Sequence, residues 1–79
     1  MSSVYSREYK VFLNRLRQAR LDAGMTQAEV AGQLKRPQSF VSKCESGERR
    51  VDIIELCLFA NVYDRSLDYF VAKSPSKKL

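Results

Sequence analysis

The chain has 79 residues, a formal net charge of +5 and an apolar content of 44%. This length forms one small domain, and the apolar content excludes a disordered chain. The basic excess favours a polyanionic partner, nucleic acid first and an anionic membrane surface second. No apolar run approaches the roughly 18 residues of a membrane span, and the first ten residues carry no signal-peptide core. We therefore expect a cytoplasmic protein that does not bind membranes.

Residue types that carry out catalysis are scarce. Two cysteines without any histidine do not make a four-ligand zinc site, so we expect no metal and no cofactor. The sequence has no glycine-rich phosphate loop and no nucleophile elbow, which argues against an enzyme. Cys44 and Cys57 fall at apolar positions of predicted helices. We interpret them as reduced core residues, with a redox sensor or an intermolecular disulfide as the alternative.

The first predicted helix covers residues 7–23. Its apolar residues recur at spacings of three, four and seven, which is the pattern of an amphipathic helix. Gly24 follows directly and closes the helix. The apolar positions are Tyr9, Phe12, Leu13, Leu16, Ala19 and Ala23.

Residues 26–47 predict two short helices joined by a basic turn. Thr26 and Glu29 have the spacing of a capping box, which marks a helix start. Pro37 ends this helix region and suits the first position of the next helix, where a missing N–H costs nothing. Gly47 then supplies a left-handed stop.

The third predicted helix, about residues 38–46, has an unusually polar outer face. Val41, Cys44 and Phe40 are its candidate core residues. The side chains left outside are Gln38, Ser39, Ser42 and Lys43. Amides, hydroxyls and a cation on a short helix are the groups that read base edges in a major groove.

Two further helices complete the expected fold. Asp52 and Glu55 form a second capping box, which predicts a helix over residues 53–62. A last short helix is expected over residues 66–71. Strand alternation and hairpin signals are missing from the sequence. We therefore predict a compact all-α domain of five helices.

The predicted domain boundaries follow from these elements. The domain covers residues 7–72, after an N-terminal arm at residues 1–6. A polar tail at residues 73–79 is expected to fray.

Residues 12–71 resemble the Cro/CI-type helix-turn-helix domain, the family of phage repressors and of bacterial xenobiotic-response-element (XRE) regulators. The residues that carry the resemblance are Leu16, Arg17, Arg20, Gly24, Thr26, Gln27, Val30, Ala31, Leu34, Val41, Ser42, Glu45 and Gly47. The resemblance implies a lambda-repressor-like fold with the helix-turn-helix at the second and third helices. It also implies a DNA-binding regulator of transcription.

The resemblance assigns DNA contacts to individual residues. Those that read bases are Gln38, Ser39, Ser42 and Lys43. Those that contact the sugar-phosphate backbone are Arg20, Thr26, Gln27, Lys35, Arg36, Ser46, Arg49 and Arg50. Arg20 and Glu45 also correspond to a pair that braces the first helix against the third.

Two residues of the turn depart from the family. Lys35 stands where the family usually has glycine, and a positive φ there would cost lysine about 1 kcal/mol. Pro37 replaces the usual serine or threonine cap. These departures leave open a shift of the base-contacting register by one residue.

A second apolar stripe runs along the fourth predicted helix. Ile54 and Leu58 fall where the family usually carries polar residues, whereas the positions that match its core are Ile53, Leu56, Cys57, Phe59 and Ala60. An apolar stripe outside the core indicates a surface that is covered by another chain or by another segment of this chain. We predict a homodimer interface formed by Ile54, Leu58, Val62 and Tyr69. The alternative is that Val4 and Tyr5 fold back over the stripe.

The sequence thus predicts a sequence-specific, double-stranded-DNA-binding transcription regulator associated with the nucleoid. It would act as a homodimer on a two-fold operator, without a small-molecule effector. Phage repressor, restriction-modification controller and stand-alone regulator all remain open. The alternative function is an antitoxin-like interaction module whose DNA binding is secondary.

Overall fold

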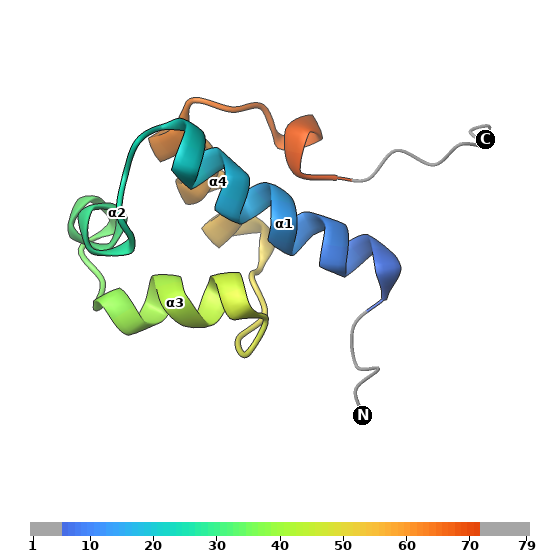
Figure 1. Cartoon of the computed structure of the whole chain (residues 1–79), viewed down its shortest axis with the longest axis horizontal. Helices are drawn as coiled ribbons and strands as arrows, with labels where there is room; N and C mark the ends of the chain where they lie inside the picture. Colours follow the sequence, from blue (N-terminus) through green and yellow to red (C-terminus); the bar gives the residue numbers. More distant parts are fainter. Residues whose placement is uncertain (1–5, 72–79) are drawn as a thin grey trace.

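The computed structural model describes residues 6–71, and in this range the chain is helical without any strand (Figure 1). The elements are α1 (Arg7–Asp22), α2 (Gln27–Leu34), α3 (Gln38–Ser46), α4 (Ile53–Tyr63) and a short 3-10 helix, η1 (Leu67–Phe70). The all-α prediction is confirmed. The fifth predicted element is a single 3-10 turn rather than an α-helix. None of the described helices is long and apolar enough to cross a membrane.

The helix starts are set by side-chain caps. Ser6 accepts a hydrogen bond from the N–H of Tyr9 at 3.1 Å, which begins α1. At the start of α2, the Thr26 hydroxyl accepts from the N–H of Glu29, and the Glu29 carboxylate accepts from the N–H of Thr26. The same reciprocal box opens α4 at Asp52. Each cap satisfies backbone donors that a helix N-terminus otherwise leaves open.

The entry to α3 differs from the expectation. Pro37 is the residue before the helix, with φ −64° and ψ 152°, and not its first helical residue. Its carbonyl accepts from the N–H of Phe40 at 2.9 Å, as the carbonyl of the residue before a helix does. No side chain caps α3 at this end.

Lys35 takes a left-handed conformation, with φ 58°, so the positive φ that would strain a lysine is present in this turn. Gly47, with φ 87°, ends α3 as predicted.

All four α-helices and η1 contribute buried side chains to the core. The ring of Phe59 stacks between Phe40 and Tyr63, with centroid separations of 6.0 Å on both sides. The buried apolar residues are Leu16, Ala19, Val30, Ala31, Phe40, Val41, Cys44, Phe59, Ala60, Tyr63 and Phe70. Figure 1 shows α3 running along one side of α1, while α2 is seen end-on, so that α2 and α3 cross steeply.

Two core predictions are wrong. Ile53 is 61% exposed, and Cys57 is exposed. The reason on α4 is its register: its inward face begins at Glu55 and continues through Phe59 and Tyr63. Positions 53 and 57 then point outward because they lie two residues away from that row.

Candidate nucleic-acid interface

The polar side chains of α3 share one exposed face. They occupy positions one, two, five and six of the helix, so they lie along one side of it. The four residues are Gln38, Ser39, Ser42 and Lys43, and all are exposed. On the opposite side of α3, Phe40, Val41 and Cys44 are buried. The structure therefore brings the four predicted base-reading residues together.

The thiol of Cys44 belongs to the core side of α3. Burial raises its pKa above the ordinary thiol value, although Arg49 acts in the opposite direction. A thiol with a raised pKa remains protonated and is a poor nucleophile.

A carboxylate on the inner side of α3 gathers groups from two other helices. Glu45 accepts from the Arg20 Nε at 2.7 Å and from its Nη2 at 3.0 Å. The amide of Gln27 donates to the same carboxylate at 3.1 Å. Arg20 also donates to the backbone oxygen of Met25 at 3.0 Å. We call this set, Arg20, Gln27 and Glu45, the Glu45 hub.

The Glu45 hub is largely shielded from solvent. The side chains of Arg20 and Glu45 are 11% and 5% exposed. The hydrogen bond to Glu45 raises the pKa of Arg20, so that the guanidinium stays charged. The hub fixes α3 against α1 and against the start of α2, because a planar guanidinium and a carboxylate pair in one geometry.

This arrangement assigns different tasks to the side chains predicted to meet phosphates near α2. Arg20 is buried in the hub, so bracing is the role that its position supports. The Thr26 hydroxyl is used as a cap. Within residues 6–71, no hydrogen bond takes the backbone N–H of Gln27 or Ala28, which stand at the start of α2. Backbone donors at a helix N-terminus are a common phosphate contact.

Two arginines from opposite ends of α3 contact one ring. The guanidinium of Arg36 lies 4.6 Å from the centroid of the Phe40 ring, and that of Arg49 lies 4.8 Å from it. Lys35, next to Arg36, is exposed at the surface of the turn. The cations at both ends are therefore oriented by the same core aromatic residue.

A second arginine–glutamate pair, which the sequence does not predict, joins the loop after α3 to α4. Arg49 donates to both oxygens of Glu55, at 2.8 and 2.7 Å, and also to the backbone oxygen of Arg50. This pairing lowers the pKa of the Glu55 carboxyl, an effect that burial opposes. The sequence predicts Glu55 only as the partner of Asp52 in a capping box. An arginine lies six residues before it in a basic loop, but this spacing does not by itself indicate an ion pair.

The loop after α3 is held by further contacts. The Ser46 hydroxyl donates to the backbone oxygen of Lys43 and accepts from the N–H of Glu48, each at 3.2 Å. The guanidinium of Arg50 lies 4.6 Å from the centroid of the Tyr9 ring. Ser46 thus closes the end of α3, while Arg50 lies against α1.

The predicted dimer residues fall into two groups. Ile54 and Leu58 are 67% and 39% exposed on α4. Val62 and Tyr69 are half-buried against the core. Two guanidinium groups lie near the centroid of the Tyr69 ring, that of Arg15 at 5.6 Å and that of Arg65 at 4.5 Å.

Three predictions fall outside the described residues. They are the fold-back of residues 4 and 5, all but the last residue of the arm predicted at residues 1–6, and the tail at residues 73–79.

Comparisons with known proteins agree with this geometry. Residues 12–68 match the family model described as a helix-turn-helix domain. A solved structure of an XRE-family-like protein from Pseudomonas syringae pv. tomato str. DC3000 is 45% identical in sequence. The match covers 78% of this chain and 76% of that chain, with a TM-score of 0.74. Among curated proteins, none matches the sequence.

Proposed function

The chain belongs to the XRE-type family of helix-turn-helix proteins, and we propose that it is a sequence-specific regulator of transcription that reads double-stranded DNA with α3. In this proposal α2 and α3 are the helix-turn-helix pair. One observation carries it: α3 presents an exposed face of amide, hydroxyl and ammonium groups, while the Glu45 hub fixes its inner side. A reading helix needs both, since base contacts require side chains held in one register.

The contacts divide into two kinds. Gln38, Ser39, Ser42 and Lys43 read base edges, where glutamine suits adenine and lysine suits guanine. The backbone of DNA is bound by the start of α2 and by the cations of Lys35, Arg36 and Arg50. Phosphate contacts set position and salt dependence, and base contacts set sequence preference.

The exposed face of α4 supports a homodimer. Ile53, Ile54, Cys57, Leu58 and Asn61 are exposed on this helix. The one charged residue of α4, Glu55, is buried and paired with Arg49. An uncharged apolar face suits a second copy of this basic chain, because it brings no like charges together. A two-fold dimer would place two copies of α3 about 34–36 Å apart, one turn of DNA.

Selection of bound duplexes from a random pool tests the DNA proposal. We expect enrichment of a two-fold sequence, and mobility shifts should show tighter binding to it than to a scrambled duplex. Lys43→Ala should cost about 1–3 kcal/mol and relax preference at one base pair. Arg65→Ala, which removes a cation far from α3, is the control and should keep the preference. Binding without any sequence preference would overturn the proposal.

Light scattering tests the homodimer. The double variant Ile54→Lys, Leu58→Lys should fold and have the mass of one chain, while the wild type has twice that mass. Leu21→Lys is the control, since Leu21 is also an apolar residue, 49% exposed, but lies on α1. A double variant that keeps the wild-type mass would refute the α4 interface.

A further inference from the structure

Helix α1 extends beyond the part of the chain that matches the family. The family match begins at residue 12, whereas α1 begins at Arg7. Residues 7–11 therefore add more than one helical turn at the N-terminal end of α1. Figure 1 shows this end of α1 projecting past the C-terminal end of α3.

The added turn is docked on the loop that follows α3. The Tyr9 hydroxyl accepts a hydrogen bond from the N–H of Val51 at 3.1 Å. Its ring lies 4.6 Å from the guanidinium of Arg50 and 5.2 Å from the ring of Phe12. Tyr9 thus holds the added turn and the loop cation Arg50 in a fixed relation.

The flank of α1 that carries Lys10 is the one that faces α3. Lys10, Leu13, Arg17 and Arg20 follow one another at spacings of three, four and three, so they lie along one flank. From that flank Arg20 reaches Glu45 of α3. The opposite flank carries Arg15, which bonds the backbone oxygen of Tyr69, and Asp22, which pairs with Arg65.

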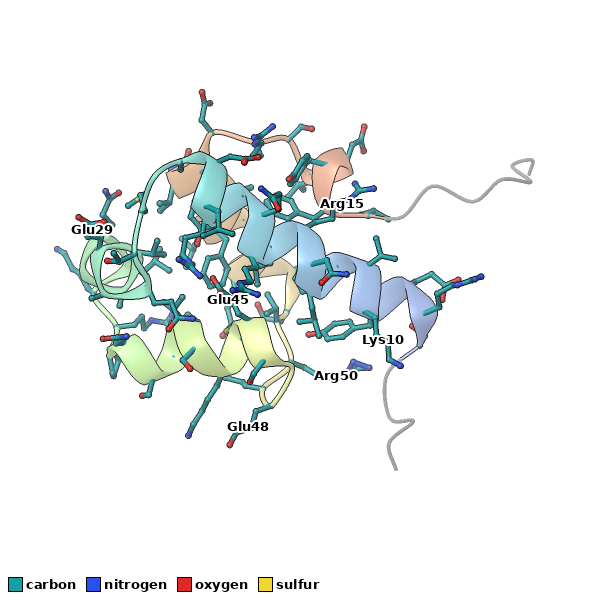
Figure 2. All side chains as sticks on the ribbon, viewed as in Figure 1. Lys10, Arg15, Glu29, Glu45, Glu48 and Arg50 are labelled. Carbon is teal, nitrogen blue, oxygen red and sulfur yellow. The ribbon has the colours of Figure 1, made fainter. Side chains whose placement is uncertain are left out.

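Figure 2 shows Lys10 and Arg50 on the same side of the molecule, at the end of α3. Among residues 6–71, no hydrogen bond or ion pair holds the ammonium group of Lys10. Glu48 is the labelled carboxylate on this side, and it lies lower, at the tip of the loop (Figure 2). Lys10 on the docked turn and Arg50 on the loop therefore border the surface that α3 presents.

We propose that Lys10, together with Arg50, binds phosphates of the DNA strand beyond the base pairs that α3 reads. The added turn of α1 would then lengthen the backbone contact of each subunit at the C-terminal end of α3. The ligand is a backbone phosphate, because an ammonium group on a long stem recognises it as a point charge without reading bases. This inference rests on the proposed function of α3.

A salt series with the selected duplex tests the inference. Log affinity falls with log salt, and Lys10→Gln should make this fall less steep by about 0.9, the value for one phosphate contact. It should leave the preferred sequence unchanged, unlike a change at Lys43. The matched control is Arg65→Gln, which changes the net charge equally but lies after α4, paired with Asp22 on the opposite flank of α1, and should keep the wild-type slope. Circular dichroism and thermal melting establish that both variants fold.

Shortened duplexes give a second readout. A duplex trimmed to the base pairs under α3 lacks the flanking phosphates, so wild type and Lys10→Gln should bind it equally. Equal slopes for wild type and Lys10→Gln on the long duplex would overturn the inference while leaving α3 as the reader. Equal losses in Lys10→Gln and Arg65→Gln would overturn it too, because net charge alone would then explain them. A wild type without sequence preference would reject both proposals.

Discussion

The two ends of α3 are built by different means. At its start, Lys35 holds a left-handed backbone conformation and Pro37 provides no side-chain cap. Towards its end, Glu45 gathers Arg20 and Gln27, Ser46 closes the last turn, and Arg49 pairs with Glu55. The start is therefore set by backbone conformation, whereas the end combines the left-handed Gly47 with side chains from three other parts of the chain.

The comparison predicts opposite sensitivities. Substitutions that remove charge should damage the end of α3, whereas substitutions that change backbone freedom should affect its start. Four variants test this, in order of expected effect.

Glu45→Ala should have the largest effect. It leaves the Arg20 guanidinium buried without its partner, which costs about 3 kcal/mol for a pair this shielded. Urea denaturation measures this loss of stability. In buffer without urea, where the variant is still folded, its affinity for DNA should also fall. A cost below about 1 kcal/mol would mean that solvent replaces the carboxylate, and the Glu45 hub would not fix α3.

Lys35→Gly should stabilise the start. Glycine adopts a φ of 58° without the clash that a side chain brings. The free energy of unfolding should therefore rise by about 1 kcal/mol. Asp64→Gly is the matched control, because Asp64 ends α4 with φ 57°. Aspartate accepts this conformation better than lysine, so its gain should be smaller. A loss of stability in Lys35→Gly would show that the lysine side chain itself holds the turn.

Glu55→Gln tests the second pair through pH. Arg49 holds the pKa of the folded Glu55 carboxyl below its ordinary value. The stabilisation is therefore present above the unfolded carboxyl pKa, about 4.3, and is lost as pH falls through the folded value. The melting temperature of wild type should exceed that of Glu55→Gln at pH 7, and the gap should close below pH 4. A gap that stays constant down to pH 3 would contradict the ion-pair interpretation.

Tyr63→Phe should change stability least. Within the described part of the chain, the buried Tyr63 hydroxyl has no hydrogen-bond partner, and burial raises its pKa. Removing an unsatisfied hydroxyl is nearly neutral, so the free energy of unfolding should change by less than about 0.5 kcal/mol. A loss above about 1 kcal/mol, measured in urea, would place this hydroxyl in the Glu45 hub and enlarge the hub at the end of α3.

Much of the local structure could be predicted from short-range patterns. Thr26 with Glu29 and Asp52 with Glu55 marked two helix starts, because a capping box involves residues only three apart. The outward face of α3 followed from helical periodicity in the same way. Pro37 was placed one position too far into the helix, since its fixed φ suits both the residue before a helix and its first turn.

The side-chain network was harder to predict. Periodicity placed Cys57 and Ile53 in the core, although the inward register of α4 begins at the charged residue Glu55. The pairing of Arg49 with Glu55 depends on how the loop folds back on α4. Nothing in the spacing shows that a capping glutamate also receives an arginine.

The sequence by itself determined where the helices begin, which face of α3 is polar, and that the chain is basic, because these depend on residues within one or two turns of each other. The tertiary structure decided which cations pair with carboxylates of other elements. Arg20 and Arg49 look equivalent to Lys10 in the sequence, yet the fold pairs Arg20 with Glu45 and Arg49 with Glu55. That distinction arises from contacts between helices, because desolvation and ion pairing depend on which residues meet in space.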